Sequence, residues 1–431
     1  MTRQVFLPKF SDKRDIAEFV EKLEAFERGD LNADQFRSFR LLRGVYGQRQ
    51  SDVQMLRVKI PFGRLGPDQL RAVADIADKY SRGYGHVTTR QNIQLHFVKL
   101  ADAEASLLRL DEAGLTTREA CGNSVRTVTA CELAEVCAGA AFDVTPYADA
   151  VTRHFLRHPL SSSLPRKFKI AFSGCGSDCA FGAIHDVGFI AQVRDGQRGF
   201  KVFAAGGLST TPQAAITLHE FVPAAEIGRV GEALVRLFHA LGNRENKARA
   251  RMKYVLRKLG EEKFRAKYAE FRATVDAEAM AELTLPEPPL NKPAPPIDEV
   301  NGEQPPGYLA WRATNAIDQK QDGFAAAYIR LFLGDITSAQ MRALAGLLSR
   351  FGDGTVRLTV DQNILVPWVD KKSLPSLYAA LREIGLSLAD VHTAGDVTSC
   401  PGAESCNLAV TSSRNVARAI SERLEAADVA G

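Results

Sequence analysis

IPFGRLGPDQLRAVA (residues 60–74) and LFLGDITSAQMRALA (residues 331–345) align at a constant offset of 271 residues. Hydrophobic positions match along both stretches, and five positions are identical: Gly63/Gly334, Gln69/Gln340, Arg71/Arg342, Ala72/Ala343 and Ala74/Ala345. At the same offset, Gln91-Asn92-Ile93 matches Gln362-Asn363-Ile364, and Gly114-Leu115 matches Gly385-Leu386. Chance would not hold one offset over this length, so the chain contains an internal duplication.

Each copy shows the same order of elements, which predicts the fold class. A strand is followed by a helix whose apolar residues have helical spacing (Leu70, Val73, Ala74 and Ala77 in the first copy), then by a strand, a second helix and a cysteine loop. With a shift of two residues, the cysteine loop of the first copy falls on that of the second. The pattern predicts an α+β fold built from two related halves.

Composition excludes several classes of protein. Hydrophobic residues make up 45% and charged residues 25% of the 431 residues, which is typical of a globular protein. The sequence contains no apolar run long enough for a membrane span and no export signal, so we expect a cytoplasmic protein without a membrane partner. The net charge of +4 is too balanced to indicate a nucleic-acid partner.

The cysteines carry the strongest chemical signal. They form the pairs Cys131-x5-Cys137 and Cys175-x3-Cys179, echoed by Cys400-x5-Cys406. In a reducing compartment such pairs are not expected to be disulfides, and two of them brought together can hold one [4Fe-4S] cluster. A zinc site and plain burial in the core are the alternatives, although zinc usually takes more tightly spaced pairs.

Basic residues alternate with apolar ones along several predicted strands. Arg57 and Lys59 alternate with apolar residues over 56–60, and Lys167 and Lys169 do so over 164–172. Over 87–97 we expect an apolar face of Val87, Ile93, Leu95 and Phe97, and an opposite face of Thr88, Arg90, Asn92, Gln94 and His96. Arg126 precedes Cys131 in a polar loop. Solvated strand faces are the simpler interpretation, but several basic strands together favour a site for anions.

Five segments resemble signature segments of the nitrite and sulfite reductase hemoproteins: GVYGQRQ, TTRQNIQLHFV, GNSVRTVTACELAEVC, LPRKFKIAFSGC and TSCPGAESCNLA. The resemblance implies a pseudo-twofold protein that holds siroheme beside a [4Fe-4S] cluster. It also implies six-electron reduction of sulfite to sulfide or of nitrite to ammonia. Because no G-x-G-x-x-G follows a predicted strand, electrons are expected from ferredoxin or from an NADPH-dependent flavoprotein.

The resemblance also implies roles for individual residues. The residues expected to act in catalysis are Arg57, Arg90, Arg126, Lys167 and Lys169. Those expected to bind the cofactor are Arg57, Lys59, Arg90, Asn92, Arg126 and Arg166. The candidate metal ligands are Cys400, Cys406, Cys131, Cys137, Cys175 and Cys179.

On this resemblance we expect six segments along the chain. They are an N-terminal helical segment (1–50), a ferredoxin-like half-domain (51–120), a larger α+β siroheme and iron-sulfur domain (121–282), a proline-rich linker (283–306), a second half-domain (307–390) and the incomplete start of a second iron-sulfur domain (391–431).

The chain departs from the family pattern in its cysteines. The family's cluster is normally held by the second repeat, but there only Cys400 and Cys406 are present, so we expect a chain that is shortened or completed by another polypeptide. Spacing alone assigns the cluster to the complete set in the first repeat. Three hypotheses stay open: a nitrite or sulfite reductase, an enzyme like precorrin-3B synthase with the same fold, and a non-catalytic iron-sulfur electron carrier.

Overall fold

The computed structural model describes residues 5, 7–278, 283–286, 293–297 and 304–426. It divides into two compact units. The first, here called the duplicated unit, comprises Met1–Arg40, Val45–Thr117 and Pro289–Gly431. The second, the inserted unit, comprises Leu41–Gly44 and Arg118–Pro288.

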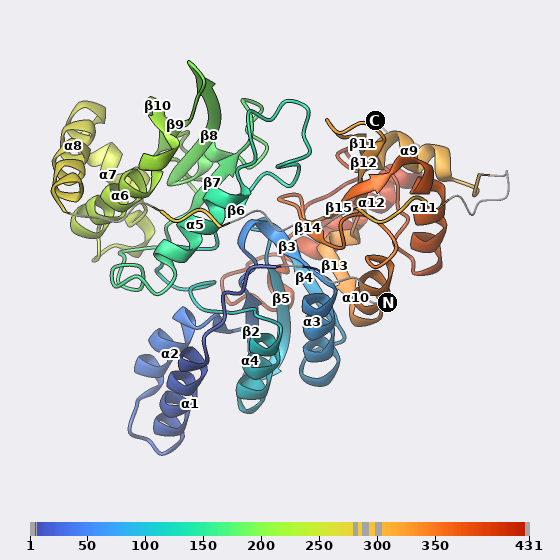
Figure 1. Ribbon diagram of the computed structural model, residues 1–431. Helices are drawn as coiled ribbons and strands as arrows, with labels where there is room; N and C mark the ends of the chain where they lie inside the picture. Colours follow the sequence, from blue (N-terminus) through green and yellow to red (C-terminus); the bar gives the residue numbers. More distant parts are fainter. Residues whose placement is uncertain (1–4, 6, 279–282, 287–292, 298–303, 427–431) are drawn as a thin grey trace. The chain divides into compact units, whose positions relative to one another are not determined.

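The duplicated unit contains two sets of elements that share a run of three strands, a helix, two strands and a helix (Figure 1). The first set has two helices before this run, and the second has one helix before it and one after it. The elements of the first set are α1 (Lys13–Glu27), α2 (Ala33–Leu42), β1 (Val45–Gly47), β2 (Val53–Val58), β3 (Arg64–Leu65), α3 (Pro67–Tyr80), β4 (Tyr84–Val87), β5 (Ile93–Lys99) and α4 (Ala103–Glu112). Those of the second set are α9 (Tyr308–Asn315), β11 (Ala316–Asp318), β12 (Phe324–Ile329), β13 (Asp335–Thr337), α10 (Ser338–Leu347), β14 (Val356–Leu358), β15 (Ile364–Asp370), α11 (Leu374–Glu383) and α12 (Ser413–Ala426).

The two halves of this unit exchange a strand. The sheet orders are β1-β2-β5-β4-β13 and β11-β12-β15-β14-β3, so each five-stranded sheet ends with a short strand from the other repeat. Ile336 of β13 pairs with Gly85 of β4, and Leu65 of β3 pairs with Val356 of β14. Neither sheet is complete without the other half.

The backbone repeats as closely as the sequence does. Positive φ angles recur at non-glycine positions 271 residues apart, at Phe62/Leu333, Gln91/Gln362 and Phe97/Trp368. Such conformations are uncommon for side chains of this size. Their recurrence confirms the predicted internal duplication and its α+β class.

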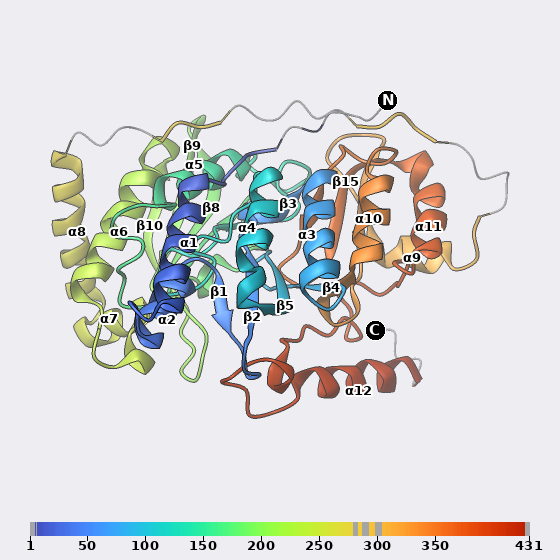
Figure 2. The same cartoon turned by 90° about the horizontal axis from the view of Figure 1, so that it is seen from below.

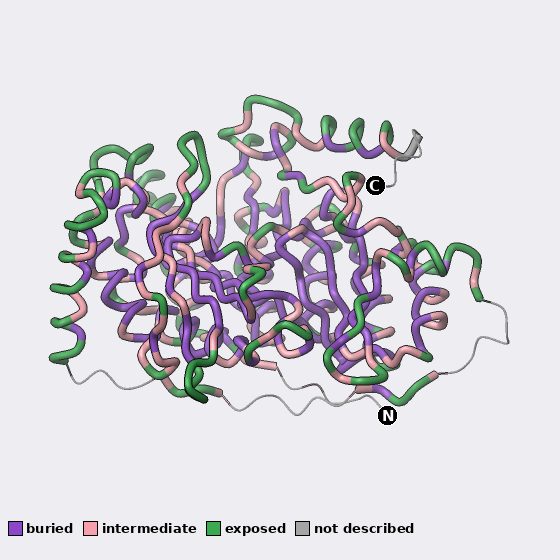
Figure 3. Tube along the Cα trace, turned by 90° about the horizontal axis from the view of Figure 1, so that it is seen from above, coloured by how far each residue is buried: buried purple, intermediate pink, exposed green. Residues whose placement is uncertain are grey.

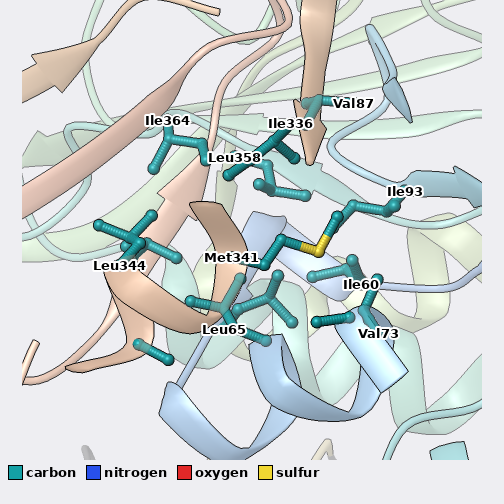
Figure 4. Packing of buried hydrophobic residues seen from close by; sticks show 14 of the residues in the cluster. Ile60, Leu65, Val73, Val87, Ile93, Ile336, Met341, Leu344, Leu358 and Ile364 are labelled. Carbon is teal, nitrogen blue, oxygen red and sulfur yellow. The ribbon is translucent and has the colours of Figure 1, made fainter. Parts of the chain in front are cut away.

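One apolar core joins the two repeats. Helices α3 and α10 contact each other, and Figure 2 shows them side by side in front of the strands. Met341 of α10 extends toward Ile93 of the first repeat, with Ile60 and Val73 close by (Figure 4). Gly85 leaves room for this contact, since a Cβ atom there would lie 2.8 Å from Met341 and from Ile93. Most residues of β2, β4, β5, β12, β14 and β15 are buried, and the buried colour predominates along the trace of this unit in Figure 3.

The N-terminus of α10 is capped by a reciprocal pair. Thr337 Oγ1 accepts a hydrogen bond from the Gln340 N–H at 3.2 Å, and Gln340 Oε1 accepts one from the Thr337 N–H at 3.0 Å. Replacing Thr337 by alanine is therefore expected to lower the free energy of unfolding by about 1 kcal/mol, whereas Thr337→Ser keeps the acceptor. Urea unfolding of both variants would measure this difference, and equal stability of the two would contradict it.

The inserted unit holds a third sheet, in the order β10-β9-β8-β7-β6. Its elements are β6 (Thr129–Ala130), α5 (Thr145–Phe155), β7 (Ile170–Ser173), β8 (Val187–Arg194), β9 (Gln197–Ala204), β10 (Ile216–Pro223), α6 (Ile227–Leu241), α7 (Met252–Leu259) and α8 (Glu261–Ala277). Strands β6, β7 and β8 are parallel and the others antiparallel. Phe172 stacks on Phe189 at 4.8 Å between ring centroids, and Phe200 meets both rings edge-on.

Two strand predictions need correction. The expected continuous strand over 87–97 is a hairpin, because the Thr88 N–H donates to the Asn92 carbonyl and closes a turn. Phe97 does not share the buried face of Ile93 and Leu95; its φ is +64° at an irregularity in pairing, and Val98 is buried instead. In the stretch 164–172, strand β7 starts only at Ile170 and is buried throughout, so the predicted alternation holds only over residues 167–170.

Part of the predicted linker over 283–306 lies outside the described residues. Its described residues, 283–286, 293–297 and 304–306, form neither helix nor strand apart from a turn at its end. The Ala294 N–H donates to the Gly352 carbonyl at 2.8 Å, and the Ile297 N–H donates to Ser373 Oγ at 2.8 Å. These contacts hold residues 293–297 on the duplicated unit.

Candidate functional site

The two cysteine loops of the inserted unit follow two neighbouring strands. Cys131 comes directly after β6, and Cys175 comes two residues after β7. Because β6 and β7 are parallel partners, their carboxyl ends lie together, and the Cys131 N–H donates to the Phe172 carbonyl at 2.9 Å. The Ala141 N–H donates to the Gly174 carbonyl at 2.8 Å and ties the loops further along. The strand pairing therefore brings both cysteine pairs to one end of the sheet.

The four thiols make contact in two cross-loop pairs. Cys131 hydrogen-bonds with Cys179, and Cys137 lies near Cys175, since a Cβ atom at Gly139 would be 3.9 Å from both of their sulfur atoms. The hydrogen bond with Cys179, together with burial, raises the pKa of Cys131 well above that of an ordinary thiol, and burial raises the pKa of Cys137. Without metal Cys131 and Cys137 are therefore neutral thiols, and a metal centre would bind them with loss of their protons.

Asp178 shapes the second cysteine loop. It has a φ of +51°, and its carboxylate accepts hydrogen bonds from Ser173 Oγ at 2.7 Å, from the Gly182 N–H at 2.7 Å and from the Ala183 N–H at 3.0 Å. These bonds fix the turn that directs Cys175 and Cys179 toward the first loop. Sequence reasoning missed Asp178, although its position inside the C-x3-C segment was a visible signal.

We expect Asp178→Ala to weaken this site without unfolding the chain. Loss of a partner that orients metal ligands typically costs about 10–100-fold in metal affinity. Iron release to a chelator from the reconstituted protein would measure the effect, with the exposed Asp195→Ala as control. Release at the same rate from Asp178→Ala and the unsubstituted protein would contradict the role given to the Asp178 carboxylate.

The other cysteine pair lies in the duplicated unit. Cys400 is exposed, and its sulfur lies 3.3 Å from Ser413 Oγ; Cys406 is half-buried. The residue ranges of this unit contain no further cysteine. The structure thus brings together the four thiols predicted in the first repeat, while Cys400 and Cys406 provide two thiols to their own unit.

The predicted cations of the inserted unit lie on neighbouring backbone segments. Val125 forms a parallel bridge with Phe168, and the Arg126 N–H donates to the Phe168 carbonyl at 2.8 Å. Val125 and Phe168 are buried, whereas Arg126, Lys167 and Lys169 are half-buried, so the basic side chains alternate with the apolar ones. Arg166 is also half-buried.

Two contacts define the surroundings of these cations. The Arg126 guanidinium donates to the Gly122 carbonyl at 2.7 and 3.0 Å and to the Ala120 carbonyl at 3.1 Å. The Lys169 N–H donates to the buried carboxylate of Asp186 at 2.8 Å, which also binds the Arg251 guanidinium at 2.7 Å. Asp186 thereby fixes the backbone from which Lys169 extends.

In the duplicated unit, polar side chains line up across three strands. Arg57 of β2 and His86 of β4 are both registered opposite Gln94 of β5. The Gln94 amide oxygen accepts from Arg57 Nε at 3.1 Å, and His86 Nδ1 lies 2.9 Å from the Asp335 carboxylate. Since alternate residues of a strand share a face, His96 follows Gln94 on this polar face.

His96 is a polar group that sequence reasoning placed on this face but did not select. Its side chain is only 7% exposed, and neither ring nitrogen has a hydrogen-bond partner within the part of the chain that the structure describes. Burial, reinforced by His86 and Arg57, lowers the pKa of His96 to about 3. A buried polar group in this state is a ready partner for a bound molecule.

The remaining predicted cofactor residues of this unit have varied surroundings. Arg90 is half-buried in the β4–β5 turn. Lys59 is buried, and its N–H donates to the Thr116 carbonyl at 2.8 Å. Asn92 Oδ1 accepts from the Ile60 N–H at 3.1 Å, as Asn363 does from the Leu331 N–H in the second repeat. This repeated contact gives Asn92 a part in holding the turn.

Sequence comparison identifies the parts of the chain separately. The nitrite and sulphite reductase 4Fe-4S domain matches residues 121–275, which include Cys131, Cys137, Cys175 and Cys179. The nitrite/sulfite reductase ferredoxin-like half domain matches residues 46–113 and again residues 317–384. The predicted ferredoxin-like character of the duplicated halves is confirmed.

Whole-chain relatives agree with this assignment. The chain is 27% identical over 443 residues to a sulfite reductase [ferredoxin] of Mycobacterium tuberculosis strain H37Rv, covering 97% of this chain and 75% of that protein. It is 30% identical to a ferredoxin–nitrite reductase of Synechococcus elongatus, covering 86% and 70%. The structure of Mycobacterium tuberculosis NirA superimposes with a TM-score of 0.78 at 25% identity, covering 96% of this chain and 78% of that one.

None of the helices within the described ranges is long and apolar enough to cross a membrane. The duplicated half-domains, the cysteine domain between them and the relatives over nearly the whole chain all lead to one assignment. This chain belongs to the nitrite and sulfite reductase family and is an oxidoreductase.

Proposed function

We propose that this chain takes part in the six-electron reduction of a small oxyanion, sulfite to sulfide or nitrite to ammonia, with ferredoxin as electron donor. The observation that carries the proposal is the convergence of four thiols at the ends of β6 and β7, within the 4Fe-4S domain. We take the two oxyanions and the electron donor from the names of the relatives, a sulfite reductase [ferredoxin] and a ferredoxin–nitrite reductase.

In this proposal Cys131, Cys137, Cys175 and Cys179 hold the [4Fe-4S] cluster. Two cross-loop thiol contacts and a rigid second loop suit a four-thiolate site. The described residues contain one group whose ligand atoms all lie within 4.8 Å, and it does not include these thiols. The four thiols are therefore spaced more widely than the ligand atoms of that group, and this wider spacing favours a cluster over a single zinc ion. When bound, the cluster would pass electrons one at a time.

The duplicated unit offers groups that fit siroheme. Siroheme carries several carboxylates, which guanidinium groups bind through charge-assisted hydrogen bonds. Arg57 and the neutral ring of His96 lie on one polar face. Neither ring nitrogen of His96 has a hydrogen-bond partner among the described residues. We propose that His96 joins Arg57, Lys59, Arg90 and Asn92, the expected cofactor residues of this unit. When bound, siroheme would supply the iron that takes the oxyanion.

The inserted unit offers groups for the oxyanion itself. Arg126, Lys167 and Lys169 would neutralise its charge, and the two ammonium groups would donate protons as oxygen leaves as water. Asp186 would keep Lys169 in place through the backbone bond at 2.8 Å.

His96→Phe is expected to lower the siroheme content of the purified protein several-fold, because the ring keeps its volume but loses both nitrogens. The iron and sulfide of the cluster should stay at the unsubstituted level. His392→Gln, at a partly exposed histidine of the same unit, is the matched control. Pyridine hemochrome and acid-labile sulfide assays measure the two quantities, and full siroheme content in His96→Phe would remove this residue from the cofactor site.

The function itself is tested by reconstituting the chain with iron, sulfide and siroheme and supplying reduced ferredoxin with sulfite or nitrite. Formation of sulfide or ammonia is the expected result. A cluster that forms without any binding of tetrapyrrole would indicate an electron carrier. Conversion of precorrin-3A with neither oxyanion reduced would indicate an enzyme like precorrin-3B synthase.

A further inference from the structure

A second group of potential metal ligands lies in the inserted unit, outside the four-thiol site. His154 belongs to the last turn of α5, His158 lies three residues beyond the end of this helix, and Glu232 belongs to α6. Their ligand atoms all lie within 4.8 Å of one another, and no other such group of three occurs in the described part of the chain. His154 Nε2 and His158 Nε2 lie 3.2 and 3.6 Å from the same oxygen, Glu232 Oε2.

The carboxylate is held in place from its other side. Arg236 Nε donates to Glu232 Oε1 at 2.7 Å, and the Arg236 guanidinium is itself bound by the Glu278 carboxylate at 2.6 and 2.8 Å. Glu278 offsets the charge of Arg236, so Glu232 keeps its negative charge for the two imidazoles. Outer contacts of this kind orient ligands in metal sites.

Burial and access also suit an ion. The side chain of Glu232 is 1% exposed, whereas those of His154 and His158 are 20% and 19% exposed, which leaves a route from solvent. Burial lowers the pKa of His158. Burial alone would raise the pKa of Glu232, but hydrogen bonds from His154 and Arg236 outweigh it and lower this pKa to about 2.

We propose that His154, His158 and Glu232 form a binding site for a divalent transition-metal ion of the zinc class. Two imidazole nitrogens and one carboxylate oxygen are an established ligand set for zinc, with water in the fourth position. The ion would link the end of α5 to α6. His158 Nδ1 accepts a long hydrogen bond from the Leu160 N–H at 3.3 Å. Ligation of a metal ion through Nε2 would put the ring proton on Nδ1, so this hydrogen bond would be lost in exchange for the metal bond.

The proposal is tested on the protein with its cluster in place, so that the four thiols are occupied. Zinc chloride is titrated by calorimetry into the chelator-treated protein, and cobalt is used to identify the ligands by its absorption. We expect one tight zinc equivalent that is lost in His154→Gln/His158→Gln and kept in His239→Gln, a control on α6. Cobalt bound there should lack the strong near-ultraviolet band of a thiolate ligand.

Three results would overturn the proposal. One is the absence of zinc uptake, which would mean that His154, His158 and Glu232 form a hydrogen-bonded group only. Another is uptake that survives in the double variant. The third is a thiolate band that assigns the ion to Cys400 and Cys406. If the double variant fails to fold, Glu232→Gln and the thermal shift of the unsubstituted protein with zinc provide the same decision, because an unchanged melting temperature contradicts a link between α5 and α6.

Discussion

Replacement of Cys175 by serine is expected to abolish cluster binding while leaving the duplicated unit folded. Cys175 contributes one of four converging thiols, and a Cβ atom at Gly139 would lie 3.9 Å from its sulfur and from that of Cys137. Loss of an outer partner of a metal ligand typically lowers metal affinity by about 10–100-fold, and loss of a direct ligand should lower it further. Iron and acid-labile sulfide in the purified protein should therefore fall to background, and oxyanion reduction with them.

Two further serine variants make this result specific. Cys121→Ser removes a buried thiol outside the pairs, and Cys400→Ser removes one of the pair in the duplicated unit. Both are expected to keep the cluster. An intact cluster in Cys175→Ser together with its loss in Cys400→Ser would show that the second repeat holds the cluster.

Asp186→Ala is expected to destabilise the inserted unit by about 3–5 kcal/mol, the cost of removing one partner from a buried ion pair. Asp186 is fully buried, and the side chain of Arg251 is 11% exposed. The substitution would leave the Arg251 guanidinium and the Lys169 N–H without the carboxylate that both bind. Hydrogen exchange of the β7 and β8 amides measures the change within this unit.

An ion pair between half-buried Lys201 and exposed Glu220 in the same unit gives the matched control. Lys201 lies 3.2 Å from Glu220, and Lys201→Ala should change stability by less than about 1 kcal/mol. The double variant Asp186→Ala/Arg251→Met should recover part of the loss, since it no longer leaves a buried charge. Equal protection in Asp186→Ala and Lys201→Ala would contradict the importance given to the Asp186–Arg251 pair.

The duplication could be predicted from the sequence because the same residues recur at one offset. Identical glycines at 63 and 334, both with positive φ, mark a turn that recurs in the two repeats, and Gln69 and Gln340 each bond back to the residue that caps the start of a helix. The exchange of β3 and β13 could not be predicted, since these strands are only two and three residues long and pair with distant segments. Hydrophobic periodicity carries no signal at that length.

The site was predictable to a different degree in each unit. Spacing alone pointed to Cys131, Cys137, Cys175 and Cys179, and the parallel pairing of β6 with β7 explains why they meet. The roles of Asp178 and His96 follow from a turn and from cross-strand register, which a single sequence does not reveal. The irregular pairing at Phe97 shows the same limit, because alternation fails wherever one strand gains a residue.

We propose that the first-repeat thiols hold the cluster of this oxidoreductase. Anomalous diffraction at the iron edge, from crystals of the reconstituted protein, tests it most directly. We predict an iron peak enclosed by the sulfur atoms of Cys131, Cys137, Cys175 and Cys179. An iron peak beside Cys400 and Cys406, with the four thiols free of metal, would contradict this account.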